Sequence, residues 1–226
     1  MSAHLSQDEK LIELLINGYD AHGFVAKLVF HDVIPDEVSP NDVKKLYGNL
    51  RNIAKSIGFA MDYGGSEYTV SKNLGIEKKE ALKYIDNYYN GFSGLKAYGV
   101  KLKNIARKTG YVETLLGRRR HVKGINDSNM KISSYYERTC LNAPQQGSAA
   151  DVPVNAQINI EHDPVCQALD AKMLLQVHDE LVFSIPKKYA HLLGCRLAKL
   201  MEDFPVDLTI PLKACWDLGR TYAEAK

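Results

Sequence analysis

The stretch LLQVHDELVF, residues 174 to 183, decides the fold, because an apolar run suited to a buried strand is interrupted by His178, Asp179 and Glu180. Strand alternation places Met173, Leu175 and Val177 on one face before the interruption, and Leu181, Phe183 and Ile185 form a matching set after it, which predicts two strands. We expect the two arms to pair as a hairpin with the three polar residues at its tip. The chain would then present two carboxylates at the end of a sheet.

Two interpretations of this acidic tip are open. It could be only a hydrated turn, because Asp favours turns and carboxylates hydrate readily. However, the turn contains neither glycine nor asparagine, and its apolar arms would hold the acids at the edge of a rigid sheet. Hard oxygen ligands in such a place suit Mg²⁺, which takes one or two carboxylates together with substrate phosphates. A site for two metal ions would need a further carboxylate from elsewhere.

A second pattern lies on the helix expected between residues 40 and 63. Successive helix residues turn by about 100°, so Arg51, Lys55, Phe59 and Tyr63 form one stripe, nearly opposite the apolar stripe that a core would take. For any single one of these four residues, the ordinary interpretation is an exposed helix face on which the residue has no particular role. Two cations followed by two rings, at four-residue spacing, are nevertheless what a phosphate tail and a flat base would require.

Composition and charge narrow the class of protein. The chain has 226 residues, of which 45% are hydrophobic, and a formal net charge of +2, which predicts a globular protein with a core. No apolar run approaches the roughly 18 residues of a membrane span, and the N-terminus lacks the features of a signal peptide. We therefore expect a cytoplasmic protein. The four cysteines lie far apart without a C-x-x-C pair, which favours four buried thiols over a zinc site or disulfides.

The capping and turn residues predict that the first two thirds of the chain are mostly helical. A capping box at Ser6–Glu9 and an N-cap at Asp20 open the first two helices, and Ser39–Asp42 opens a long helix that ends near Tyr63. The other expected elements are helices over 77–90 and 93–109, a basic hairpin around 116–117, helix over 129–160 interrupted near Pro144 and Pro153, a helix over 189–203 and a strand over 208–213.

Taken together, these features resemble the C-terminal part of family A DNA polymerases, the DNA polymerase I family. Arg51-x-x-x-Lys55-x-x-x-Phe59-x-x-x-Tyr63-Gly64 is similar to motif B of the fingers, and residues 175–181 are similar to motif C of the palm. Residues 110–119 and 142–151 also resemble the family pattern, in the family's order.

The resemblance implies an α+β, right-hand polymerase fold that is incomplete in this chain. Residues 1–125 would be a mostly helical fingers subdomain with the basic hairpin. Residues 126–226 would be the C-terminal part of the palm, with part of an antiparallel sheet that carries the motif C hairpin.

The resemblance also implies roles for the residues of the helical stripe. His22, Arg51 and Lys55 would hold the triphosphate of the incoming nucleotide, and Lys55 is the candidate for protonating the leaving pyrophosphate. Phe59 would pack on the sugar and base, and Tyr63 would lie at the templating position. A phenylalanine at position 59 implies poor acceptance of dideoxynucleotides.

Primer-template DNA would be bound by other residues. Arg138, Asn142 and Gln146 recur every four residues and match positions along the minor groove, where donors can test base-pair geometry without specifying sequence. Arg118 and Arg119 belong to the basic hairpin, a cluster that could bind phosphates, although a solvated face is the commoner explanation of such a cluster.

The palm motif would carry the chemistry. Asp179 would be a ligand of two Mg²⁺ ions shared with an aspartate of a partner, and Glu180 and His178 would lie near the primer terminus. Asp179, Glu180 and Lys55 are thus the candidate catalytic residues.

One family element is missing from the sequence. In the family, motif A carries the second metal-binding aspartate, and here Met1 stands where motif A should just have ended. We therefore expect the C-terminal subunit of a split, phage-like DNA polymerase, acting in the host cytoplasm if it is phage-encoded. Its N-terminal half, with motif A and the thumb, would be a separate polypeptide. The alternatives are a catalytically idle DNA-binding or regulatory remnant, and a single-subunit RNA polymerase, which Phe59 and Glu180 disfavour.

Overall fold

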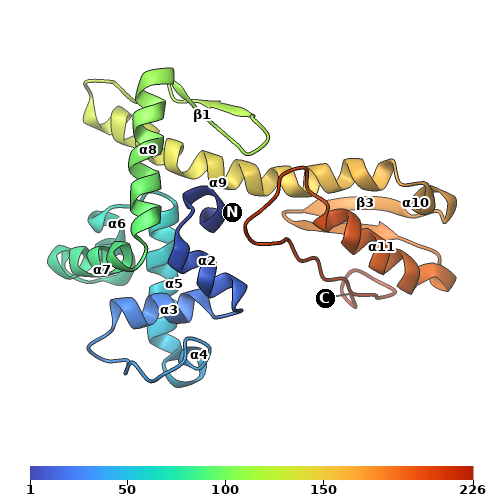
Figure 1. Ribbon diagram of the computed structural model, residues 1–226, viewed down its shortest axis with the longest axis horizontal. Helices are drawn as coiled ribbons and strands as arrows, with labels where there is room; N and C mark the ends of the chain where they lie inside the picture. The colour runs from blue at the N-terminus through green and yellow to red at the C-terminus, as the bar shows by residue number, and fades with distance from the viewer. Residues whose placement is uncertain (226) are drawn as a thin grey trace. The chain divides into compact units, whose positions relative to one another are not determined.

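The computed structural model describes residues 1 to 225, which form two compact units. Unit 1 is Met1–Gln145, and unit 2 begins at Gln146. Unit 1 is mostly helical, unit 2 combines helices with irregular segments, and each contains a two-stranded antiparallel sheet, which confirms the α+β class (Figure 1). None of the helices among residues 1–225 is long and apolar enough to cross a membrane.

Unit 1 is built from short helices followed by a hairpin. Its elements are α1 (Ser2–Ser6), α2 (Glu9–Ile16), α3 (Ala21–Val29), α4 (Val43–Leu46), α5 (Gly48–Asp62), α6 (Glu67–Leu74), α7 (Lys78–Gly91), α8 (Ser93–Thr109), β1 (Tyr111–Glu113), β2 (Arg119–His121) and the first part of α9 (Met130–Glu161). The expected helices over 77–90 and 93–109 and the basic hairpin are confirmed, and α6 is an additional helix.

The start of α2 differs from the expected capping box. Ser6 is the last residue of α1, and Asp8 is the N-cap of α2, with its Oδ1 accepting the Leu11 N–H at 2.9 Å. The other oxygen of Asp8 accepts the Gly94 N–H at 2.7 Å at the start of α8. One buried carboxylate therefore caps two helices, which a serine hydroxyl at position 6 could not do.

The prediction of one long helix from Ser39 to near Tyr63 is also wrong. Residues 39–42 form turns, and the helix is divided into α4 and α5 at Tyr47, whose φ of −135° is not helical. The N-cap at Asp20 is confirmed, because its side chain accepts the His22 N–H at the start of α3.

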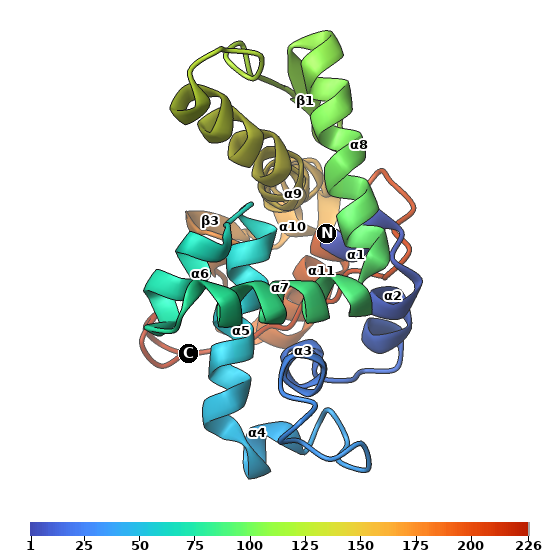
Figure 2. The same cartoon turned by 90° about the vertical axis from the view of Figure 1, so that its left-hand side faces the viewer.

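The core of unit 1 forms where three helices meet. The helix α3 packs against both α5 and α7, and Figure 2 shows α5 and α7 crossing, with α3 alongside. Ala26, Ile57 and Phe92 are almost fully buried there. This packing fixes which face of α5 is covered and therefore which face remains available to a ligand.

The helix α9 does not break at its prolines, contrary to expectation. It runs from Met130 to Glu161 as one helix, and the division between the units falls within it. Pro144 and Pro153 are both buried. Each proline removes one backbone donor, but packing around the ring keeps the helix continuous.

Unit 2 continues from α9 with α10 (Pro164–Ala168), β3 (Lys172–Val177), β4 (Glu180–Ser184) and α11 (Ala190–Glu202). Leu193 and Leu197 of α11 are buried with Leu181 and Phe183 of the hairpin packed against the same cluster. The hairpin and the helix over 189–203 are thus confirmed.

The expected strand over 208–213 is absent from the described part of unit 2, where these residues have no regular structure. Pro211 lies in the middle of this segment and has no N–H to give to a strand ladder. The expectation of four buried thiols is also corrected, because Cys195 and Cys215 are exposed while Cys140 and Cys166 are buried.

Candidate functional site

The stripe of cations and rings lies on the uncovered face of α5. Ala54 and Ile57 of the same helix are buried, whereas Phe59 is 45% exposed and Tyr63, the C-cap of α5, is 48% exposed. Lys55, one turn before Phe59, is also exposed and holds its Nζ 5.5 Å from the centre of the Phe59 ring. The four-residue spacing therefore places these groups side by side along one surface of unit 1.

Two residues at the start of α3 contact the stripe. The ring of His22, on α3, lies edge-to-face with Phe59 at a centroid distance of 5.7 Å. Asp20 accepts two hydrogen bonds from Arg51, at 2.5 Å from Nε and 3.0 Å from Nη2. The packing of α3 on α5 thus gathers Asp20, His22, Arg51, Lys55 and Phe59, which are separated by up to 39 positions in the sequence, into one group.

The charges in this group influence one another. Burial lowers the pKa of His22, and the positive charges of Arg51 and Lys55 lower it further, against the attraction of Asp20. Burial acts to raise the pKa of Asp20, but the hydrogen bond and charge of Arg51, together with hydrogen bonds from the backbone of Gly23 and His22, outweigh it, so the pKa of Asp20 is lowered. At neutral pH the group therefore contains an ionised Asp20 and an uncharged His22. An anion bound beside His22 would favour its protonation.

The acidic tip lies on the β3–β4 hairpin. Val177 pairs with Glu180, so His178 and Asp179 form a two-residue turn, and His178 has a φ of 56°. A positive φ is uncommon for a residue other than glycine and costs on the order of 1 kcal/mol or more. This turn holds Asp179 and Glu180 exposed at the end of the sheet. A β-bulge between Met173 and Leu175 changes the register, so the expected simple alternation along β3 is wrong.

The exposed carboxylates fit the ligand preference of Mg²⁺. Asp179 and Glu180 are adjacent and accessible, and Mg²⁺ is usually held by one or two carboxylates together with substrate phosphates. Among residues 1–225, no group of three or more His, Cys, Asp or Glu side chains forms a metal site by itself. The hairpin can therefore contribute part of a ligand set.

The three expected groove-binding residues lie on α9 at four-residue spacing. Arg138 and Gln146 are exposed, and Asn142 is partly buried. The end of α5 approaches this helix in unit 1: a Cβ at Gly64, whose φ is +68°, would lie 3.2 Å from the Cα of Arg138 and 3.0 Å from Cδ1 of Leu141. Glycine suits both this conformation and this space, so Gly64 allows the end of α5 to approach α9 closely.

The basic hairpin is partly neutralised by its own residues. Arg119 donates from Nε to Glu113 at 2.9 Å, and its guanidinium lies 4.4 Å from the centre of the Tyr111 ring. The side chain of Arg119 remains more than half exposed. Its other donors remain accessible to a phosphate.

Comparison with known proteins decides the family, since a model of DNA polymerase family A matches residues 1–224. The chain belongs to DNA polymerase family A. DNA polymerase I of Streptococcus pneumoniae (strain TIGR4) is 42% identical over 224 residues, and that of Bacillus subtilis (strain 168) is 41% identical. The alignments cover 99% of this chain, which spans about a quarter of these relatives, 24% of each.

A solved structure agrees with this assignment. The POL domain of Pol1 from M. smegmatis, in complex with DNA primer-template and dNTP, matches with a TM-score of 0.87 and 36% identity. The match covers 99% of this chain and 38% of that chain. The match confirms the right-hand polymerase fold and shows that this chain contains only part of it.

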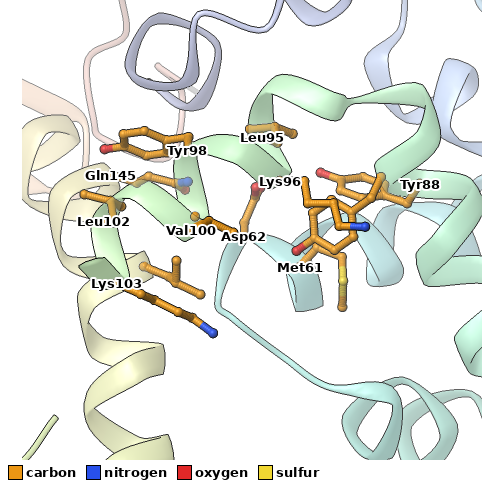
Figure 3. Close-up of a pocket in the computed structure, with 13 residues that line it drawn as sticks. Met61, Asp62, Tyr88, Leu95, Lys96, Tyr98, Val100, Leu102, Lys103 and Gln145 are labelled. Carbon is orange, nitrogen blue, oxygen red and sulfur yellow. The ribbon is translucent and has the colours of Figure 1, made fainter. Parts of the chain in front are cut away.

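Unit 1 also contains a cavity that the sequence did not predict. A cavity of about 180 Å³ in unit 1 is lined by the end of α5 together with residues of α7, α8 and α9. Figure 3 shows Asp62 among Tyr88, Tyr98 and Lys96 in its wall. Burial raises the pKa of Asp62 to about 6, and attraction by the Met1 amino group opposes this only in part. The local pattern gave no signal for this cavity, because at about 100° per residue Asp62 falls on the same side of α5 as Arg51 and Lys55, the side expected to face solvent.

This polymerase segment should become more stable when Asp62 is replaced by asparagine. The stabilisation that protonated Asp62 provides is complete below its ordinary pKa of 3.8 and is lost as the pH rises through about 6. Asp62→Asn should therefore raise the free energy of unfolding at pH 8 by on the order of 2 to 3 kcal/mol and change it little at pH 4. Urea unfolding at both pH values measures this.

The control for Asp62 is Asp86→Asn, which changes an exposed acid on α7 of the same unit. This variant should shift the free energy of unfolding by less than about 0.5 kcal/mol at either pH. A loss of stability in Asp62→Asn at pH 8 would mean that the carboxylate makes a favourable interaction in the folded state.

Proposed function

We propose that this chain supplies the fingers, residues 1–125, and the C-terminal part of the palm, residues 126–226, of a DNA-directed DNA polymerase. The enzyme adds deoxynucleotides to a primer 3′ end, as directed by a template, by two-metal phosphoryl transfer. The observation that carries the proposal is the group on α5, where cations and an exposed ring lie side by side. The names of the similar proteins support it.

In this proposal the α5 group binds the incoming deoxynucleoside triphosphate. Arg51, Lys55 and His22 bind the triphosphate, and Phe59 packs on the sugar and base. Tyr63 occupies the templating position, against the α9 segment that carries Arg138. Lys55 donates a proton to the leaving pyrophosphate, for which its exposed ammonium is suited. His22, uncharged at neutral pH, can take up a proton as phosphate oxygens approach.

The acidic hairpin contributes to the same reaction. Asp179 would hold Mg²⁺, and Glu180 and His178 would lie near the primer terminus. When bound, Mg²⁺ favours ionisation of the primer 3′ hydroxyl and offsets charge on the leaving group. The rigid turn keeps the Asp179 carboxylate in place, so that ligand binding needs little rearrangement.

Primer-template DNA is bound by donors of α9 and the basic hairpin. Arg138, Asn142 and Gln146 test base pairs in the minor groove, where every pair presents acceptors. Arg118 and Arg119 bind backbone phosphates, which makes the affinity dependent on salt.

We further propose that the second metal-binding aspartate and the thumb come from an N-terminal polymerase half, present as a separate polypeptide. The apolar residues Met173, Leu174 and Leu175 of β3 are 44% to 61% exposed, in a sheet that has two strands among the described residues. An exposed apolar strand of this kind is suited to a further strand from a partner.

Primer extension tests the proposal. This chain, the N-terminal half and their mixture are each given a primed template, Mg²⁺ and four deoxynucleotides. We expect extension only in the mixture. Extension by this chain alone would disprove the two-chain arrangement. If the mixture binds DNA but does not extend the primer, the chain is an idle DNA-binding remnant instead.

Replacing Phe59 by tyrosine should increase the use of dideoxynucleotides. A dideoxynucleotide lacks the 3′ hydroxyl, and the new phenolic hydroxyl can supply the missing hydrogen bond beside the sugar. One such bond corresponds to roughly 10- to 100-fold in the ratio of dideoxy to deoxy incorporation. Single-nucleotide incorporation by the assembled enzyme measures this ratio.

Tyr68→Phe is a suitable control, because it changes one hydroxyl on another exposed ring of unit 1. It should leave the ratio unchanged. An unchanged ratio in Phe59→Tyr would mean that this ring does not face the sugar.

A further inference from the structure

Asp20 connects the two helices that carry the proposed triphosphate-binding residues. It is the N-cap of α3, and its Oδ1 accepts the His22 N–H at 3.1 Å. Its two oxygens also accept the Nε and Nη2 donors of Arg51, on α5. The side chains of Asp20 and Arg51 are only 19% and 18% exposed. At this burial the pair is less screened than an ordinary surface ion pair.

The geometry of the pair leaves one edge of Arg51 available. A guanidinium has five N–H donors in a planar fork, and Asp20 uses two of them on the edge formed by Nε and Nη2. The other three include the two donors on Nη1 and the second donor on Nη2. These donors form an outer edge that can bind two phosphate oxygens in parallel. Arg51 can therefore hold Asp20 and a phosphate at the same time.

Asp20 is itself held in place from the opposite side. Its backbone N–H donates to Oδ1 of Asn41 at 2.6 Å. Gly23 of α3 lies so close to the same loop that a Cβ there would be 2.0 Å from the carbonyl oxygen of Pro40. The start of α3 is thus locked to residues 40 and 41, and Asp20 provides Arg51 with a fixed anchor.

We propose that Asp20 is a positioning residue that directs the outer edge of Arg51 toward the triphosphate of the incoming nucleotide. The inference rests on the proposed role of Arg51. A free arginine side chain samples many rotamers, and ordering it on binding weakens affinity. Asp20 orders it beforehand. The opposite possibility is that the negative charge of Asp20 competes with the phosphates for Arg51, and the two possibilities predict opposite effects of removing the charge.

The test uses the full chain and inorganic triphosphate as the probe. Asp20→Asn retains a good N-cap for α3 but replaces one of the two acceptor oxygens with an amide nitrogen. We expect the Kd for inorganic triphosphate, measured by NMR titration, to rise about five- to tenfold. We also expect the Arg51 side-chain Nε–H signal to lose its protection from exchange. An unchanged or lower Kd would overturn the proposal.

The structure offers a matched control in unit 2. Asp163 is the N-cap of α10, and its Oδ2 accepts hydrogen bonds from both Nε and Nη2 of Arg196, the same two donors that Arg51 gives to Asp20. Asp163→Asn should weaken the cap of α10 and the pair with Arg196 about as much as Asp20→Asn weakens the cap of α3 and the pair with Arg51. It should nevertheless leave the Kd for triphosphate unchanged.

A second variant serves if Asp20→Asn does not fold. Asp20→Ser keeps a capping oxygen but is too short to reach Arg51, and the same rise in Kd is expected.

A double-mutant cycle separates the two proposals. If Arg51→Ala does not weaken triphosphate binding, the proposed role of Arg51 is wrong. If Arg51→Ala weakens it, and Asp20→Asn weakens it equally in the presence and absence of Arg51, then Asp20 does not act through Arg51. We expect Asp20→Asn to have no further effect in the Arg51→Ala background, because the residue it positions is gone.

Discussion

Replacing Asp179 by asparagine should reduce primer extension by the proposed two-chain polymerase at least about a thousandfold, since a bound metal would stabilise the transition state by several kcal/mol. The amide has nearly the shape of the carboxylate but no charge, and it is a weaker ligand for a hard cation. The turn already holds position 178 at a positive φ, and asparagine at position 179 leaves this backbone unchanged. Single-turnover extension with saturating DNA and deoxynucleotides measures the loss.

The control for Asp179 is Asp170→Asn in the same unit. Asp170 is exposed, precedes β3 and has a φ of 58°, a conformation that asparagine tolerates well. Its ion pair with Lys172 is a surface pair and contributes little. This variant should extend primers normally. Normal extension by Asp179→Asn would remove the hairpin from the proposed chemistry.

Replacing Asp8 by alanine should lower the free energy of unfolding of unit 1 by about 3 kcal/mol. An N-cap is worth about 1 kcal/mol, and a buried donor left without an acceptor costs about 1 to 3 kcal/mol. Asp8 satisfies the Leu11 N–H of α2 and the Gly94 N–H of α8 at a position that is 3% exposed. A urea titration followed by helix circular dichroism measures the change.

The matched control for Asp8 is Asp42→Ala. Asp42 precedes α4 in the N-cap position, but it is exposed and makes no capping hydrogen bond with its side chain. The expected change is below about 0.5 kcal/mol. Equal effects of the two variants would show that neither hydrogen bond of Asp8, to Leu11 or to Gly94, contributes to stability.

The sequence alone determined the features that depend on local periodicity. The four-residue spacing of Arg51, Lys55, Phe59 and Tyr63 predicted one surface stripe, because the turn per residue of a helix is constant. The two apolar runs that flank His178 and Asp179 predicted a hairpin with acids at its tip, although the β-bulge in β3 interrupts the simple alternation that the pattern predicted. Both patterns arise within a few residues of chain, so they needed no knowledge of what packs against them.

Tertiary packing decided the features for which local signals were insufficient or misleading. Pro144 and Pro153 predicted helix breaks, but burial of their rings stabilises α9 through both positions. Ser6 matched a capping box, but Asp8 is the cap because it also satisfies α8. In each case a contact from a distant part of the chain contributes more free energy than the local preference.

The same distinction applies to the candidate site. The sequence identified the cations and rings, but only the packing of α3 on α5 brings Asp20 to Arg51 and His22 to Phe59. Likewise, only the surroundings of Asp62 raise its pKa to about 6. Residue type and helix period determined which groups the chain presents. The low-dielectric contacts between segments far apart in sequence decided how those groups are oriented and charged.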